Sequence, residues 1–137
     1  MDDPRYTLQI VGRVSSPLTS REQCPKQGHE GAPEAWLKIE PAFADAVEGI
    51  HAGDDILVLT WLHLGLRDVL RVRPRGEASR PLRGVFSTRS PDRPNPIGLH
   101  RVEVLEVRGN RLHVRPLEAL DGTPILDIKP VLPRVDE

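Results

Sequence analysis

The sequence predicts a mainly β fold, a small single-sheeted antiparallel β-barrel with one short helix. Eight short segments show the apolar and polar alternation typical of strands, and only one segment has helical spacing. Many strands with a single short helix favour a closed or nearly closed barrel over a parallel sheet covered by helices. Neither an internal repeat nor a linker divides the chain, so residues 1–137 are expected to form one domain.

The predicted strands are spread over the whole chain. The clearest pair flanks Gly109-Asn110, because apolar residues such as Val104 and Leu112 alternate with polar ones on both sides. A glycine-containing dipeptide between two such runs is a signal for a two-residue hairpin. In chain order, the predicted strands are residues 6–16, 35–41, 55–64, 69–74, 83–89, 101–107, 111–117 and 124–132.

The one predicted helix covers residues 41–53. Pro41 suits a first helical turn, where the missing N–H costs nothing. Phe43, Val47 and Ile50 follow at spacings that place them on one face. We therefore expect this helix to cover one side of the sheet with its apolar face.

Composition limits the function classes. The net charge is −1, from 19 basic and 20 acidic residues, which excludes a globally basic nucleic-acid binder but leaves room for a local basic face. The single cysteine, Cys24, cannot form an intramolecular disulfide, and the chain shows no secretion signal and no long apolar segment. We expect a cytoplasmic protein with no membrane association. Its five histidines are too scattered to predict a metal site.

The segment from Arg83 to Arg101, RGVFSTRSPDRPNPIGLHR, is stiffer than an ordinary loop. Each of its three prolines fixes its own φ angle and restricts the residue before it. The side chains of Arg89, Arg93 and Asn95 therefore point in directions that are set before any ligand binds, which suits an anion or a polar ligand. The alternative is a proline-rich crossover at a sheet edge, with arginines that are only solvated.

Three motifs carry a resemblance to a known family. The stretch GVFSTRSPDRPNPIGLHRVEVLEV, together with LDGTPILDIKP and TWLHL, resembles the TsaA-like (YaeB-like) family of TrmO-type tRNA methyltransferases. The resemblance covers nearly the whole chain and is weakest in the first third. It implies a β-barrel that binds S-adenosylmethionine, is unrelated to the Rossmann-like methyltransferases and is usually a homodimer.

The activity implied by the resemblance is methylation of the exocyclic nitrogen of threonylcarbamoyl-adenosine, next to the anticodon in tRNA. Two alternatives stay open. The chain is a methyltransferase that acts on another RNA or on a small molecule, or it is a non-catalytic barrel that binds S-adenosylmethionine. The near-neutral charge permits the first of these.

The resemblance also assigns cofactor residues by motif. The segment CPKQG resembles the family's P-R-Q segment with a lysine in place of the arginine. A guanidinium such as that of Arg89 suits the carboxylate of S-adenosylmethionine. The residues implied to bind the cofactor are Pro25, Lys26, Gln27, His63, Leu64, Arg89, Leu99, Asp121, Gly122, Thr123 and Pro124.

Catalytic and acceptor residues are less clearly indicated. The accepting nitrogen has a delocalised lone pair, so a general base would help, and Asp127 and His63 are the candidates. His63 ends an apolar strand, and its alternative is a buried core histidine. The threonyl carboxylate needs a cation, for which we expect Arg93 first and Lys129 second. Asn95 either contacts the substrate or is a structural amide at a strand end.

The chain departs from the family pattern in several places. Asp92, His100 and Val131 stand where relatives often have an aromatic or apolar residue, a serine and a tyrosine. These departures concern substrate selection more than cofactor binding. Many bacterial members continue into a C-terminal domain, whereas this sequence ends with DIKPVLPRVDE, so we expect no C-terminal extension.

A local basic edge is also predicted. Five arginines precede or begin the proline-rich segment, and in a dimer two such edges would flank the active sites and contact tRNA phosphates. The alternative is ordinary solvation of a strand edge. The five residues are Arg71, Arg73, Arg75, Arg80 and Arg83.

Overall fold

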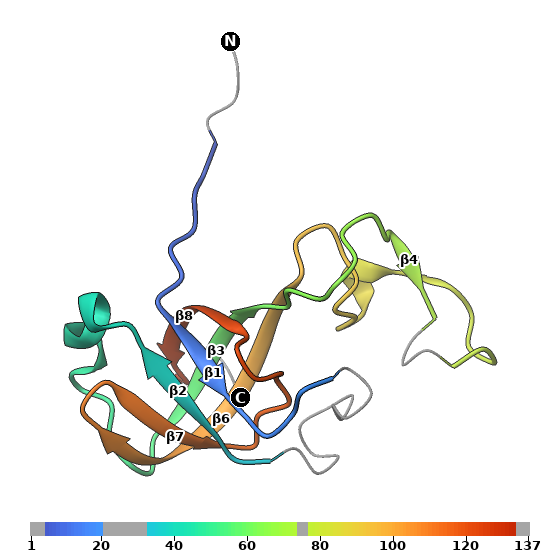
Figure 1. Cartoon of the computed structure of the whole chain (residues 1–137). Helices are drawn as coiled ribbons and strands as arrows, with labels where there is room; N and C mark the ends of the chain where they lie inside the picture. Colours follow the sequence, from blue (N-terminus) through green and yellow to red (C-terminus); the bar gives the residue numbers. More distant parts are fainter. Residues whose placement is uncertain (1–4, 21–32, 74–76, 134–137) are drawn as a thin grey trace.

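The computed structural model describes residues 5–20, 33–73 and 77–133, and it confirms the predicted barrel. Six antiparallel strands of these residues close in the order β1-β2-β7-β6-β3-β8 (Figure 1). Every strand of the barrel therefore has a paired neighbour on both sides. The strands are β1 (Gly12–Ser15), β2 (Ala35–Ile39), β3 (Asp55–Trp61), β6 (Ile97–Arg108), β7 (Arg111–Arg115) and β8 (Pro124–Pro130).

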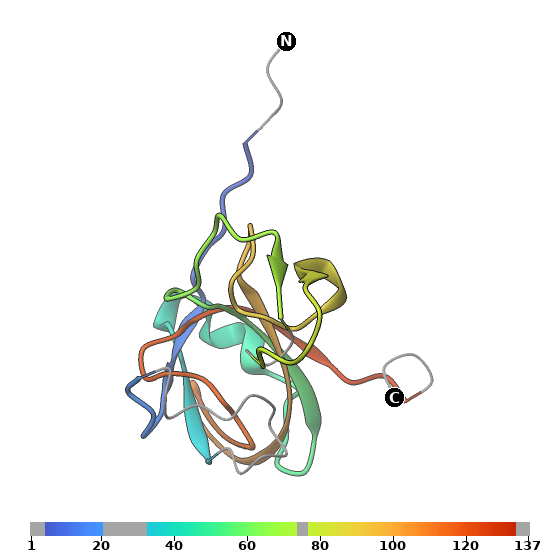
Figure 2. The same cartoon turned by 90° about the vertical axis from the view of Figure 1, so that its right-hand side faces the viewer.

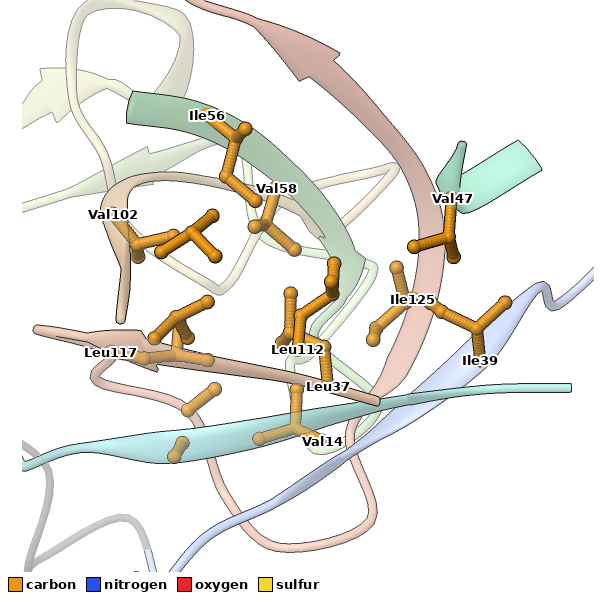
Figure 3. Packing of buried hydrophobic residues seen from close by; sticks show 14 residues of the cluster. Val14, Leu37, Ile39, Val47, Ile56, Val58, Val102, Leu112, Leu117 and Ile125 are labelled. Atoms are coloured by element: carbon orange, nitrogen blue, oxygen red, sulfur yellow. The ribbon is translucent and has the colours of Figure 1, made fainter. Parts of the chain in front are cut away.

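The inward side chains of the strands fill the barrel. Successive strand residues point to opposite faces, so every second residue of β2, β3 and β7, and of β6 as far as Val104, is buried. Figure 3 shows the apolar cluster that results, with Leu37, Val58, Leu112 and Ile125 fully buried near its middle. Small branched side chains of this kind pack well between neighbouring strands.

The predicted helix is a 3₁₀-helix, η3 (Pro41–Val47), and it is shorter than expected. It ends at Val47 with Glu48 as its C-cap, and Gly49 follows with a φ of 95°, which a residue with a side chain rarely adopts. The predicted apolar face is confirmed, because Val47 is buried beside Ile39 and Ile125 in Figure 3. Phe43 and Ile50 also pack against the core.

The predicted hairpin at Gly109-Asn110 is confirmed. It joins β6 to β7, with Arg108 opposite Arg111 and Gly109 at a φ of 59°. β6 begins four residues earlier than predicted, at Ile97 instead of Arg101, because the end of the proline-rich segment pairs with β3.

Two predicted strands lie outside the barrel. Residues 69–74 and 83–89 contribute only the short pair β4 (Arg71–Val72) and β5 (Arg83–Gly84), which projects away from the barrel (Figure 1). β5 passes directly into a 3₁₀ turn, η5 (Val85–Ser87), because hydroxyl groups of the turn bond to nearby carbonyls and compete with strand pairing. We call residues 69–73 and 77–87 the arm.

The N-terminal strand is also shorter than predicted. Residues 5–10 are exposed and run away from the barrel (Figure 2), and pairing begins at Gly12. No helix in the described part of the chain is long and apolar enough to cross a membrane.

Candidate functional site

Two loops meet where β3 ends and β6 begins. Trp61 and Ile97 are opposite each other in the β3–β6 ladder, so residues 62–67 after β3 and residues 88–96 before β6 leave the barrel side by side. The backbone N–H of Leu62 donates to the carbonyl of Pro96 at 2.7 Å. We call residues 62–67 the first loop and residues 88–96 the proline loop. This junction brings the predicted residues His63 and Leu64 to the segment that carries Arg89.

Further contacts hold the two loops together at their tips. The N–H of Leu66 donates to the Asp92 carboxylate at 2.9 Å. Gly65 lies directly against the proline loop, and a Cβ there would collide with the carbonyl oxygen of Pro91. A larger residue at position 65 would therefore push the loops apart. Asp92 thus has a structural role in this chain.

Arg67 closes the other side of the junction. Its Nε donates to the carbonyl of Pro94 at 2.7 Å, and its Nη2 donates to Oδ1 of Asn95 at 3.0 Å. The guanidinium also lies 5.1 Å from the ring centre of Trp61, within the range of a cation–π contact. Because Arg67 has only donors, the Asn95 oxygen faces it, and the Asn95 amino group is left as a donor for another partner.

Arg93 organises the turn that bears Arg89. Its Nη1 donates to the carbonyls of Thr88 at 2.9 Å and Ser90 at 3.0 Å, and its Nη2 donates to the carbonyl of Val85 at 2.7 Å. A planar guanidinium is suited to hold several carbonyls at once. The predicted substrate role of Arg93 stays a prediction, and these contacts add a structural role.

Arg89 itself is exposed, between two carbonyls that Arg93 fixes. It has no hydrogen-bond or ion-pair partner among the described residues. His63 is exposed in the first loop as well, so its alternative as a buried core histidine is wrong. β3 ends at Trp61, so His63 lies two residues beyond the end of the strand. Both side chains are available to a ligand.

The turn at residues 121–124 lies against the chain that leads out of β1. The Asp121 carboxylate accepts from the N–H of Ser16 at 3.0 Å, and the N–H of Asp121 donates to the Leu18 carbonyl at 2.7 Å. Gly122 has a φ of 83°, which the turn needs. Thr123 is buried and donates to the Leu120 carbonyl, so its hydroxyl supports the turn.

Three predicted cofactor residues, Pro25, Lys26 and Gln27, lie outside the described residues. The turn at residues 121–124 is nevertheless bound to Ser16 and Leu18, which precede that segment in the chain. Pro124 also begins β8, whose next residue Ile125 is opposite Thr60 of β3. The turn therefore leads into the strand next to β3, near the end of β3 where the first loop starts.

Leu99 lies on the outer wall of the barrel. It is 44% exposed and is opposite Leu59, while Ile97 is opposite Trp61. Leu59 in turn is opposite Asp127 of β8. The outer wall below the two loops is therefore an apolar strip of β3 and β6 with a carboxylate at its edge.

The two remaining candidates, Asp127 and Lys129, pair with each other. Nζ of Lys129 is 3.3 Å from Oδ2 of Asp127, whose Oδ1 accepts from the N–H of Ile128 at 2.9 Å. Lys129 is opposite Leu57, about 13 Å along β3 from the last residue of the strand. It borders a hollow of about 530 Å³ next to Asp55 and Arg101. The structure thus separates Lys129 from the two loops.

The side chains of Thr60, His100 and Glu118 form a hydrogen-bonded group that the sequence did not predict. Nε2 of His100 is 2.8 Å from Oγ1 of Thr60, and its Nδ1 is 2.9 Å from a carboxylate oxygen of Glu118. Burial by itself would raise the pKa of Glu118, but the hydrogen bond and the charge of His100 hold that pKa below its usual value. A Cβ at Gly98 would collide with the Thr60 hydroxyl.

Sequence reasoning missed Gly65, Arg67 and Glu118. Gly65 and Arg67 act through contacts with residues that are about thirty positions away in the chain, and an isolated glycine or arginine after a strand is no signal for such contacts. Within the described residues, no group of three histidine, cysteine, aspartate or glutamate side chains is arranged to hold a metal ion.

The comparisons with known proteins agree with these observations. The sequence model of the tRNA-methyltransferase O N-terminal domain matches residues 13–137. A protein of Methanothermobacter thermautotrophicus named "Probable S-adenosyl-L-methionine-binding protein" is 49% identical over 136 residues, which cover 99% of this chain and 97% of that protein. An "S-adenosyl-L-methionine-binding protein" of Archaeoglobus fulgidus is 46% identical over 94% of this chain and 91% of its own length.

A solved structure is similar over almost the whole chain. The crystal structure of TrmO from Pseudomonas aeruginosa superposes with a TM-score of 0.77 at 29% sequence identity. The match covers 97% of this chain and 59% of the crystallised chain. This chain therefore spans about three-fifths of the length of that protein.

Proposed function

Since the chain belongs to the family of the tRNA-methyltransferase O N-terminal domain, we propose that it transfers a methyl group from S-adenosylmethionine to the exocyclic nitrogen of threonylcarbamoyl-adenosine next to the anticodon in tRNA. The observation that carries this proposal is the junction of the first loop with the proline loop. It joins residues predicted to bind the cofactor with residues predicted to bind the acceptor. Two separate sets of hydrogen bonds hold the loops together. One is the bond from Leu66 to Asp92, and the other consists of the two bonds that Arg67 donates to the proline loop.

The residues around the junction fit the cofactor. S-adenosylmethionine has a carboxylate, a sulfonium that carries the reactive methyl group, and an adenosyl moiety with flat apolar faces. The exposed guanidinium of Arg89 suits the carboxylate. Leu64 and Leu99, each about half exposed, offer apolar surface for the adenosyl moiety.

The turn at residues 121–124 completes this proposed cofactor site. Asp121 uses Oδ1 to hold Ser16, and its second carboxylate oxygen suits the amino group or the sulfonium charge of the cofactor. The contacts of this turn to Ser16 and Leu18 fix its position beside the chain that leads out of β1.

In the transfer, the acceptor nitrogen forms a bond to the methyl carbon while the carbon–sulfur bond breaks. S-adenosylhomocysteine leaves, and the nitrogen loses its proton to a base or to water. The chain's main contribution is to align nitrogen, carbon and sulfur. Fixed backbone directions in the proline loop serve that alignment, because little conformational freedom is left to lose on binding.

Of the two candidate bases, the contacts favour His63. It is exposed in the first loop, beside the segment that carries Arg89. Asp127 lies farther down the outer wall and is paired with Lys129. Asp127 would first have to leave its ion pair with Lys129 before it could accept a proton. We therefore place His63 at the acceptor nitrogen and Asp127 outside the reacting atoms.

For the acceptor, we place Asn95 and Arg93 at the threonylcarbamoyl group. The Asn95 amino group is turned outward by Arg67 and suits a carbonyl or carboxylate oxygen. Arg93 has five N–H donors, of which three bond to carbonyls. The others suit the threonyl carboxylate. Lys129 lies too far from the junction to share that group, so a contact between Lys129 and the acceptor would involve another part of the tRNA.

The proposal includes a homodimer. Large apolar side chains of the first loop, the arm and β6 are exposed to solvent. Exposed apolar side chains that gather together mark protein–protein interaction sites. A second copy would cover them and shield the cofactor site from water. The residues are Leu64, Leu66, Leu70, Leu82, Phe86, Ile97 and Leu99.

The experiment that tests this function is mass spectrometry of tRNA nucleosides from a strain that lacks the gene. The proposal requires loss of the methylated form of threonylcarbamoyl-adenosine and accumulation of the unmethylated form. Restoration by the wild-type gene and not by an Arg89→Ala gene would tie the loss to this site. An unchanged nucleoside profile would favour the second candidate, a non-catalytic barrel, which is consistent with relatives named only as S-adenosylmethionine-binding proteins.

A further inference from the structure

Four basic side chains form a row across the outside of the barrel. Arg13 of β1 is opposite Lys38 of β2, Lys38 is opposite Arg111 of β7, and Arg111 is opposite Arg108 of β6. The four strands lie next to one another (Figure 1), and all four side chains are exposed. We call these residues the basic row. Since neighbouring strands are about 4.8 Å apart, the row is about 14 Å long.

This arrangement does not serve stability. Like charges directly opposite each other on neighbouring strands are destabilising, and the basic row contains three such pairs in succession. Lys38 and Arg111, in the middle, have no ion-pair partner among the described residues. Within the described part of the chain, Arg108 alone of the row pairs with a carboxylate, that of Glu106 at 2.7 Å. An anionic ligand would relieve the repulsion.

An aromatic side chain lies alongside the basic row. Trp36 stacks on His113 with ring centres 4.6 Å apart and planes at 8°, and the Arg108 guanidinium is 5.8 Å from the Trp36 ring centre. Trp36, Lys38, Arg108 and Arg111 line a hollow of about 220 Å³ together with Ser15. Proteins that bind single-stranded nucleic acid combine cations for the phosphates with aromatic rings for the bases.

One end of the basic row touches the proposed cofactor site. Nη1 of Arg13 donates to the Gly122 carbonyl at 3.1 Å, and Arg13 is opposite Pro124 in the β1–β8 ladder. Gly122 and Pro124 belong to the turn assigned to cofactor binding. A strand that leaves the reacting nucleotide on this side would therefore meet the basic row first.

The arm offers a weaker alternative. Arg73 donates to the carbonyl of Arg80, and Arg80 is paired with Glu77 at 2.9 Å. Two of the arm's arginines are thus used within the arm. Arg75 lies outside the described residues. The arm's remaining pair, Arg71 and Arg83, provides a control with the same charge and similar exposure.

We propose that the basic row and Trp36 bind the RNA strand that flanks the modified nucleotide, with Lys38 and Arg111 on phosphates and Trp36 against a base. This inference rests on the proposed function, because that function supplies the RNA. The basic row gives a nearly neutral chain a local positive surface for a polyanion.

The test measures binding of a fluorescein-labelled anticodon stem–loop RNA by anisotropy over a range of salt concentrations. Each phosphate contact contributes about 0.7 to the slope of log affinity against log salt for a single strand. The Lys38→Ala/Arg111→Ala variant should therefore lose about 1.4 from that slope. Arg71→Ala/Arg83→Ala should keep the wild-type slope.

Trp36→Ala separates RNA from other polyanions. It should weaken RNA binding roughly tenfold at fixed salt and leave the slope unchanged, because stacking is not ionic. Its fold is checked by thermal unfolding, and the charge variants keep the test valid if Trp36→Ala does not fold. Inorganic polyphosphate serves as a competitor, and its affinity should not respond to Trp36→Ala.

Two results would overturn the inference. One is a wild-type salt slope for Lys38→Ala/Arg111→Ala. The other is equal competition by polyphosphate together with unchanged RNA affinity of a folded Trp36→Ala variant, which would mark a surface for any polyanion or for an acidic protein. Cofactor binding by all variants should stay at the wild-type level. If RNA binding follows these expectations but no methyl group is transferred, the proposed function fails and the RNA surface stands.

Discussion

The carboxylate of Asp92 accepts a hydrogen bond from the backbone N–H of Leu66 at 2.9 Å, and this contact joins two loops that the sequence separates by 26 positions. Leu66 follows the predicted cofactor residues His63 and Leu64, and Asp92 follows Arg89 by three residues. A single side chain thereby links the two halves of the proposed cofactor site.

Asp92→Ala should weaken S-adenosylmethionine binding modestly. One exposed hydrogen bond contributes about 1 kcal/mol, which is roughly fivefold in affinity. Isothermal titration calorimetry measures the effect, and Asp92→Asn, which keeps an acceptor oxygen, should retain most of the wild-type affinity. Equal affinities of Asp92→Ala and wild type would mean that the loops stay joined without this contact.

Arg89→Ala should have a larger effect on the same affinity. The lost contact is a charge-assisted hydrogen bond to the cofactor's carboxylate, which is worth about 1.5–3 kcal/mol. The matched control is Arg83→Ala, another exposed arginine nearby, which should bind as wild type. If a folded Arg89→Ala variant shows unchanged affinity by calorimetry, Arg89 does not bind the carboxylate.

Arg93→Ala should abolish methyl transfer while it lowers cofactor affinity less than Arg89→Ala does. Its guanidinium holds three carbonyls of the turn and, in our proposal, the threonyl carboxylate. Arg93→Lys keeps the charge but not the planar fork, so it should not restore transfer. Single-turnover transfer assays and calorimetry on both variants decide this, and full activity of Arg93→Lys would reduce the role of Arg93 to its charge.

The stability of the barrel should depend on Glu118 in acid. Its folded-state pKa is below the ordinary value of 4.5, so Glu118 stabilises the fold above that value, and this contribution is lost as the pH falls through the lower folded-state pKa. Thermal unfolding from about pH 6 down to about pH 3 should show a shallower loss of stability for Glu118→Gln than for wild type. Parallel curves would show that His100 does not stabilise the Glu118 carboxylate.

The barrel could be predicted because its signals are local. Alternating residues such as Val102 and Val104 identify a strand, and Gly109-Asn110 identifies the hairpin that follows it. The arm could not be predicted correctly, because its alternation resembles that of a strand while the hydroxyls of Ser87 and Thr88 bond locally and end β5 after two residues.

The contacts that build the loop junction could not be predicted from the sequence. The motif around Arg89 and the turn at Asp121 stand out in the sequence. The roles of Gly65 and Arg67 depend on how closely two distant loops approach, which no spacing along the chain reveals. Lys129 illustrates the converse, because it belongs to a strong motif and yet lies away from the junction.

The central claim is that this chain methylates threonylcarbamoyl-adenosine through a site built at the loop junction. The most direct measurement is transfer of a labelled methyl group from S-adenosylmethionine by the purified chain to two anticodon stem–loops, one with threonylcarbamoyl-adenosine and one with unmodified adenosine at the same position. Our account predicts labelling of the modified stem–loop alone, and none with Arg89→Ala. No transfer by a chain that binds the cofactor, or equal labelling of both stem–loops, would contradict it.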